Sequence, residues 1–133
     1  MPFYADADAF YAVMHKLFER LSVDPAATAD FHSKKMVVRI SCTQPNVELV
    51  LDGRTNPIRA SFGPQPGKVD LGLNMTCDLL HGILTGTQSL KAAFLDGRLK
   101  VTGNVFRALQ LADLFRKIEA LYPSLLQELG YQI

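Results

Sequence analysis

The hydrophobic periodicity of the sequence changes at Met36, and this change constrains the fold more than any other feature. Before Met36, apolar residues recur every three or four positions, which is the spacing of one helix face. After it, apolar and polar residues alternate, which predicts four consecutive strands joined by short turns rich in Gly and Pro. These strands are expected at residues 36–42, 47–52, 58–62 and 69–75. Leu99 and Val101 alternate in the same way and predict a fifth strand.

Helical spacing precedes the strands. Residues 6–22 place Phe10, Met14 and Leu17 along one face, which predicts an amphipathic helix. Asp24 and Pro25 have the pattern of an N-cap followed by a first-turn proline, so a short helix is expected from there to about Phe31.

Helical spacing also returns after the fourth strand. A leucine-rich helix capped by Thr76 or Asp78 should end at Gly86, and a shorter one capped by Thr87 or Ser89 should follow. A long helix with a wide apolar face is expected to start at Gly103 and Asn104 and to be broken by Pro123 near Tyr122. The apolar residues from Leu125 to Ile133 could then form a flap or a frayed terminus.

These elements predict an α+β fold in which a five-stranded, largely antiparallel sheet is covered on one face by helices. Strands that are apolar on one side and polar on the other need such a cover, because only one of their faces can remain in water. We find no repeat or linker, so residues 1–133 are expected to form one domain.

The charge balance argues against several classes of partner. The formal net charge is only +1, so no long-range field would attract nucleic acid. No secretory signal is recognisable, no apolar run is long enough to insert stably in a membrane, and the two cysteines are too few for a disulfide-rich secreted fold. We therefore expect a cytoplasmic protein with reduced thiols.

Catalytic and metal-binding patterns are weak. Cys77 and His81 lie four residues apart on a predicted helix, which would suit a thiol and its base, but no third orienting group is recognisable. A buried thiol beside a surface histidine is the simpler interpretation. Neither a phosphate-binding glycine motif nor a metal-ligand spacing is present, so no cofactor and no metal are expected.

The other titratable groups have ordinary interpretations. His15 and His32 are isolated in the sequence and are expected to be solvated. Asp6 and Asp8 should complement the dipole of the first helix rather than act as a carboxylate pair. A basic set on the polar face of the sheet is expected to be solvated, with docking of an anionic head group or coenzyme A phosphate as the alternative. This set is Arg39, Arg59, Arg98 and Lys100.

Two segments carry a family resemblance. In residues 78–86 an aspartate opens a leucine-rich helix that a glycine ends. Residues 90–104 then give an alanine-phenylalanine pair, an aspartate-glycine turn, a short basic strand and a final glycine. This pattern resembles the C-terminal signature of the sterol carrier protein two family. It is dense over residues 76–115, whereas upstream the similarity is one of element order alone.

The resemblance implies helices and sheet enclosing an apolar tunnel that takes fatty acids, acyl-CoA thioesters, sterols, isoprenoids or similar lipids. Leucine-, valine- and phenylalanine-rich positions on the sheet and the helices are the candidates to line it. These are Val38, Ile40, Leu49, Phe62, Leu71, Leu73, Leu80, Leu84, Phe94, Leu111 and Phe115. Dense core packing is the alternative at each position.

The predicted function is therefore the binding and intracellular carriage or presentation of an apolar ligand, without catalysis. Non-directional contacts predict a broad ligand range. The alternative is a non-catalytic interaction module that assembles with itself or with a lipid-metabolising enzyme, which leaves a homodimer or an enzyme partner open. A thiol hydrolase that uses Cys77 is the third hypothesis.

Overall fold

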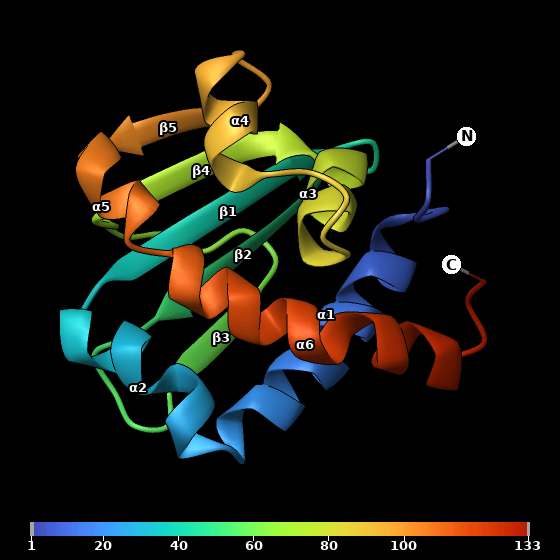
Figure 1. Ribbon diagram of the computed structural model, residues 1–133, viewed down its shortest axis with the longest axis horizontal. Coiled ribbons are helices and arrows are strands. Elements are labelled where there is room, and N and C mark those ends of the chain that lie inside the picture. Colours follow the sequence, from blue (N-terminus) through green and yellow to red (C-terminus); the bar gives the residue numbers. More distant parts are fainter. Residues whose placement is uncertain (1, 133) are drawn as a thin grey trace.

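The computed structural model describes residues 2–132 and contains one five-stranded sheet. The alternating segments form the strands, as predicted. They are β1 (Val37–Thr43), β2 (Val47–Asp52), β3 (Arg59–Phe62), β4 (Leu71–Thr76) and β5 (Lys100–Gly103). The order across the sheet is β3-β2-β1-β4-β5 (Figure 1).

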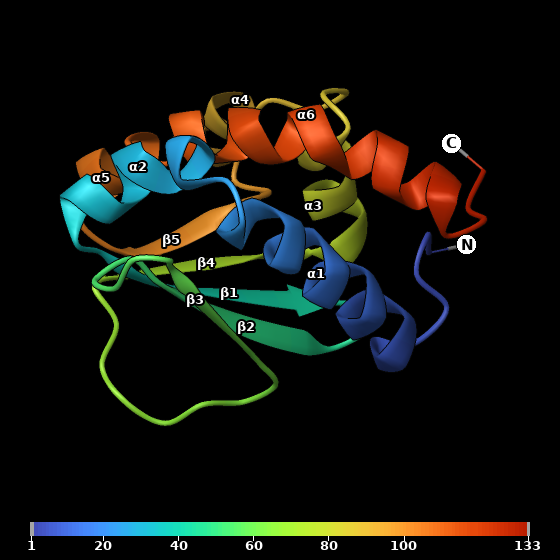
Figure 2. The same cartoon turned by 90° about the horizontal axis from the view of Figure 1, so that it is seen from below.

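The sheet is largely antiparallel, as expected, but one central pair is parallel. β1 lies between β2 and β4, and it runs parallel to β4 with Val38 opposite Leu71 and Ile40 opposite Leu73. The chain can place β4 there because the β3–β4 loop crosses beneath the sheet (Figure 2). β5 then pairs antiparallel with β4 at the edge.

All the helices lie on one face of the sheet, while the loop between β3 and β4 projects from the other (Figure 2). In chain order they are α1 (Ala7–Ser22), α2 (Pro25–Lys34), α3 (Cys77–Leu84), α4 (Leu90–Leu95), α5 (Val105–Leu109) and α6 (Ala112–Glu128). The expectation that helices cover a single face is therefore confirmed.

Side-chain caps explain where most of the helices begin. The Asp6 carboxylate accepts a hydrogen bond from the amide of Ala9 at 2.8 Å, and Asp24 likewise caps α2 ahead of its first-turn proline. At each of the two positions where the sequence left a choice, the structure selects one residue: Thr76 caps α3 and Ser89 caps α4. Each cap satisfies an amide that the helix itself leaves without a partner.

The last helix differs from the prediction in two ways. The single long helix expected after Asn104 is wrong, because the chain turns at Gln110 and Leu111 and forms α5 and α6 separately. Ala108 and Leu111 are both buried on either side of this turn, so the apolar face expected of one helix is kept although the helix is divided.

The predicted break at Pro123 is also wrong, because α6 continues through it to Glu128. A proline inside a helix costs about 3 kcal/mol. Tyr122, Leu125 and Leu126 on either side are each no more than 1% exposed, and their burial offsets that cost. The residues predicted to form a flap are thus partly core, while Ile133 lies outside the described residues.

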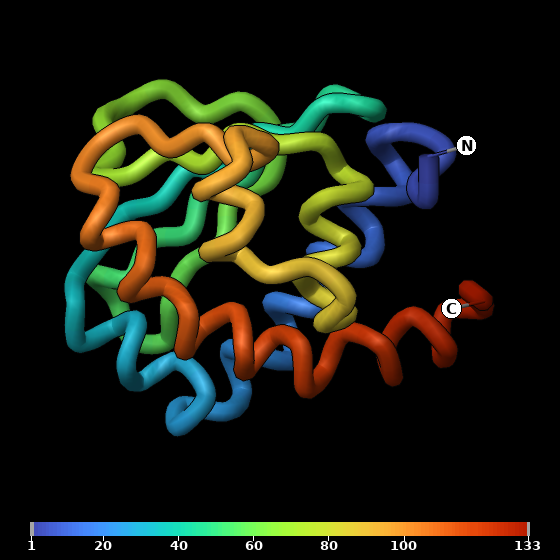
Figure 3. Tube along the Cα trace, turned by 45° about the horizontal axis from the view of Figure 1, so that its top comes forward, coloured from blue at the N-terminus to red at the C-terminus, as the bar shows by residue number. Residues whose placement is uncertain are grey.

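The core is one continuous apolar cluster between the sheet and the helices. The two chain ends lie on the same side of the molecule (Figure 3). The Phe3 and Tyr131 rings stack there with centroids 5.3 Å apart. At the opposite side Gly103 ends β5 with a φ of +100°, and a Cβ there would lie 2.6 Å from the Asp70 carbonyl oxygen. No helix in the described part of the chain is long and apolar enough to cross a membrane.

Candidate functional site

The structure brings the predicted lining residues together between the sheet and the helices. Nine of the eleven are buried members of the core cluster, and Phe62 and Phe94 are partly buried against it. The sheet contributes its inward-facing residues from β1, β2 and β4, and α3 and α6 contribute the residues above them. Their common location is settled, whereas their role as the walls of a tunnel stays a prediction.

A pocket lies in the helical layer and reaches this region at Phe115, and we call it the roof pocket. Its volume is about 400 Å³, within the range of about 300–1,000 Å³ usual for small-molecule sites. It lies between the segment from α3 to α4 and the first half of α6. Its apolar walls are Ile83, Leu90, Leu109, Ala112 and Phe115.

The mouth of the roof pocket is polar and mostly charged. Lys91 and Arg116 supply two cations, Glu119 one carboxylate, and Gln88 and Ser89 neutral polar groups. An apolar pocket with a charged mouth can enclose a hydrocarbon chain while a polar head group stays near water. Of the predicted lining residues, Phe115 lies in this pocket.

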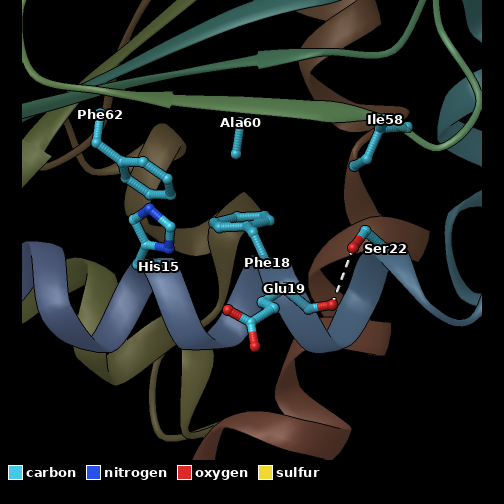
Figure 4. A pocket seen from close by; sticks show the side chains of 7 residues that line it. All are labelled: His15, Phe18, Glu19, Ser22, Ile58, Ala60 and Phe62. Atoms are coloured by element: carbon cyan, nitrogen blue, oxygen red, sulfur yellow. Dashed lines mark hydrogen bonds between the residues drawn. The ribbon is translucent and has the colours of Figure 1, made fainter.

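A smaller pocket lies at the edge of the sheet between α1 and β3, and we call it the edge pocket. Its volume is about 220 Å³. Figure 4 shows the His15 ring against Phe62 and the Phe18 ring beneath Ala60. The His15 and Phe62 centroids are 4.8 Å apart with the rings nearly parallel. The edge pocket is therefore an aromatic recess that contains one predicted lining residue, Phe62.

A buried polar chain closes the other end of the helical layer. The Tyr4 and Tyr122 hydroxyls form a hydrogen bond, and the Tyr122 hydroxyl lies 2.8 Å from His81 Nδ1. Burial raises the pKa of both tyrosines and lowers the pKa of His81 below its ordinary value of 6.5. All three groups are therefore neutral near pH 7.5.

The neutral state sets the direction of these hydrogen bonds. Among the described residues Tyr4 has no second hydrogen-bond partner, so its hydroxyl must donate to Tyr122 to be satisfied. Tyr122 then donates to His81 Nδ1, which accepts as the neutral tautomer. The Phe3 ring covers this chain by stacking on the His81 ring at 3.7 Å, and the Phe3 amide donates to the Asp78 carboxylate at 2.9 Å.

The hydrogen bonds of Cys77 and His81 point to other partners and not to each other. The Cys77 thiol donates to the Pro45 carbonyl oxygen at 3.2 Å, whereas His81 Nδ1 accepts a hydrogen bond from the Tyr122 hydroxyl. Both Cys77 and Cys42 are buried free thiols, and the hydrogen bond with Cys77 together with burial raises the pKa of Cys42. The same contact with Cys42 lowers the pKa of Cys77, but no base is hydrogen-bonded to the Cys77 thiol among the described residues, so its geometry is that of a structural thiol and not of a nucleophile paired with His81.

The remaining histidines and acidic residues have structural contacts. His32 Nδ1 donates to the Gly53 carbonyl oxygen at 2.9 Å, while His15 is stacked in the edge pocket. Asp6 caps α1 and Asp8 lies in its first turn, as expected for residues that complement the helix dipole. Within residues 2–132, no cluster of three His, Cys, Asp or Glu side chains could hold a metal ion.

Sequence reasoning missed the buried tyrosine pair and the polar mouth of the roof pocket. Tyr4 and Tyr122 are 118 residues apart, and neither has a motif around it that predicts a hydrogen bond. The polar mouth gives no signal either, because Arg116 has Asp113 and Glu119 as its helical neighbours, which is the pattern of an ordinary solvated face.

Comparison with known proteins decides the family. The profile of the SCP-2 sterol transfer family matches residues 14–116, well over half of the chain. The chain belongs to the SCP-2 sterol transfer family. The resemblance predicted from residues 76–115 is therefore confirmed and extends upstream through the first four strands. Membership places the chain among lipid-binding and lipid-transfer domains, and no curated protein matches it by sequence.

Solved SCP-2 structures share the fold at low sequence identity. Sterol carrier protein 2 from Yarrowia lipolytica, in its apo form, matches with a TM-score of 0.66 at 16% identity, over 80% of this chain and 89% of that one. The UbiJ-SCP2 ubiquinone synthesis protein matches with a TM-score of 0.62 at 20% identity, over 92% of this chain and 98% of that one. The alkylsulfatase Pisa1 from Pseudomonas gives 0.55 at 19% identity, over 67% of this chain but only 14% of the enzyme.

Proposed function

We propose that this SCP-2 protein binds an apolar, lipid-like molecule between its sheet and its helices and carries or presents it in the cytoplasm without transforming it. The roof pocket supports this proposal most directly, because its apolar walls adjoin the core and its mouth is charged. Fatty acids, acyl-CoA thioesters, sterols and isoprenoids are the ligand classes that we propose. Within this proposal, the eleven predicted lining residues surround the ligand.

The energetics suit reversible carriage. Each buried methylene contributes about 0.8 kcal/mol, so about ten enclosed carbons contribute on the order of 8 kcal/mol before the cost of ordering the ligand. An affinity in the micromolar range follows once about sixteen carbons are enclosed. The cations at Lys91 and Arg116 would favour a ligand that ends in a carboxylate or phosphate.

Filling the roof pocket provides the test. Ala112 lines this pocket and its own side chain is exposed, so Ala112→Trp can fill the pocket without disturbing the core. Ala120→Trp is the matched control, since Ala120 is an exposed alanine on the same helix that does not line the pocket. We expect Ala112→Trp to weaken binding of a fluorescent fatty acid at least tenfold, and Ala120→Trp to leave it unchanged. Equal affinity for both variants would refute entry through the roof pocket.

A second function, as a protein-interaction module, is favoured by one feature of the surface. Leu95 is 72% exposed and Phe106 is 78% exposed, both on short helices that flank β5. An apolar surface of this kind can serve a homodimer or an enzyme partner. Light scattering at high concentration separates the homodimer from the enzyme partner. If the protein forms a homodimer through this surface, the wild type should have a higher molar mass than Phe106→Ser, whereas equal masses are expected if it does not associate with itself.

A further inference from the structure

A third pocket, on the outer face of the sheet, has a different chemistry from the roof pocket. Its volume is about 500 Å³, and it lies between the first three strands and the β3–β4 loop that projects beneath them (Figure 2). Val37, Val50 and Val69 provide its apolar surface. We call it the outer pocket, and the sheet separates it from the helices.

Arg39 holds the loop that walls this pocket. Its Nη2 donates to the carbonyl oxygens of Gln65 and Gly67 at 2.8 and 3.2 Å, and its Nε lies 2.7 Å from the Glu48 carboxylate. The loop is therefore attached to the sheet by the two hydrogen bonds of Arg39 Nη2, and the charge of Arg39 is paired with Glu48.

Arg59 lies at the same pocket without a carboxylate partner. Asp52 is directly opposite Arg59 in the β2–β3 register, but Arg54 already donates to both oxygens of Asp52, at 3.0 and 2.8 Å. The Arg54 guanidinium holds the pKa of Asp52 down at about 2, so this carboxylate stays ionised and occupied. Among the described residues neither Arg59 nor Lys68 forms an ion pair, and both are exposed.

The charged residues of the outer pocket are thus mostly cationic. Arg39, Arg54, Arg59 and Lys68 line it, against the single carboxylate of Asp52. Guanidinium groups present a planar fork of donors that matches phosphate oxygens, and ammonium groups add a compact positive charge. Because Arg59 and Lys68 have no ion-pair partner in the described part of the chain, the site is suitable for an anion whose oxygens can accept their hydrogen bonds.

We propose that the outer pocket binds a small organic molecule that carries a diphosphate group. The diphosphate would lie between Arg59 and Lys68, and the organic part would contact the valines, since the volume exceeds what a phosphate alone requires. A recess walled by a loop fits a free small molecule better than the flat surface of a bilayer. The proposal is independent of the lipid function, because this site lies on the opposite face of the sheet.

Isothermal titration with inorganic pyrophosphate at low ionic strength tests the proposal. Arg59→Gln combined with Lys68→Gln should weaken binding about tenfold or more, because charge-assisted hydrogen bonds are lost. Lys100→Gln combined with Lys117→Gln is the control: it removes the same charge from exposed positions outside the pocket and should leave binding unchanged. No binding by the wild type, or equal weakening in both variants, would overturn the proposal.

Two further measurements cover the other outcomes. Amide NMR of the wild type should show pyrophosphate-induced shifts centred on Ser61 and Lys68, which needs no variant to fold; shifts centred on α4 and α6 would overturn the assignment. Sedimentation with vesicles of phosphatidylcholine and phosphatidic acid provides the last arm. Binding to vesicles without binding of free pyrophosphate would indicate a membrane surface and contradict the proposal.

Discussion

The buried hydrogen-bond chain from Tyr4 through Tyr122 to His81 predicts that Tyr122→Phe and Tyr4→Phe lower the stability of the protein by different amounts. Tyr122→Phe removes the central hydroxyl, which leaves the Tyr4 hydroxyl, on a residue only 1% exposed, without an acceptor and His81 without its donor. A buried polar group without a partner costs about 1–3 kcal/mol, and a lost hydrogen bond about 1 kcal/mol. The free energy of unfolding should therefore fall by about 2–4 kcal/mol.

Tyr4→Phe should cost less. It removes the donor at the end of the chain, while Tyr122 can still donate to His81, so about 1 kcal/mol is expected. Adding Tyr4→Phe to Tyr122→Phe should restore part of the lost stability, because the double variant has no buried hydroxyl left without a partner.

Urea denaturation at pH 8 measures these differences, since His81 is neutral there in both the folded and the unfolded protein. The expected order of stability is wild type, Tyr4→Phe, the double variant and then Tyr122→Phe. If Tyr4→Phe were the costlier single change, or the double variant the least stable protein, the proposed direction of donation would be wrong.

Three further predictions concern stability. Burial lowers the pKa of His81, so the contribution of neutral His81 to the free energy of unfolding is complete above pH 6.5 and is lost as the pH falls through the pKa of His81 in the folded protein. The urea midpoint should therefore drop between pH 7.5 and 5, and it should drop less in His81→Gln. Asp6→Ala should cost about 1 kcal/mol, measured by thermal unfolding, through loss of the α1 cap; no change would exclude a capping role. Gly103→Ala should destabilise more than Gly97→Ala: both have positive φ, but only Gly103 meets a backbone oxygen, so similar melting temperatures would contradict this explanation.

Local patterns in the sequence were enough to predict most of the fold. The change of period at Met36, the cap at Asp24 and the choice of Thr87 or Ser89 as a cap depend on neighbouring residues, so they can be recognised in a single chain. The apolar alternation also identified the inward-facing side of β1, β2 and β4, which is why the five lining residues predicted on these strands are buried: Val38, Ile40, Leu49, Leu71 and Leu73.

What the sequence could not predict depends on contacts between distant segments. The parallel pairing of β1 with β4 requires knowing which strands become neighbours, and the alternation is the same for either arrangement. The continuation of α6 through Pro123 depends on the burial of Tyr122 and Leu126, which outweighs the local preference of proline. Among the described residues Arg59 has no ion-pair partner because Asp52, which lies opposite it, is bonded to Arg54 instead. The spacing of these residues in the sequence does not indicate which arginine binds Asp52.

Native mass spectrometry of freshly purified protein is the most direct test of a lipid held between the sheet and the helices. We predict a species heavier than the bare chain, whose extra mass disappears on organic extraction and returns when the extract or a long-chain fatty acid is added back. A single species at the mass of the bare chain, before and after incubation with fatty acids, acyl-CoA thioesters, sterols and isoprenoids, would contradict the account.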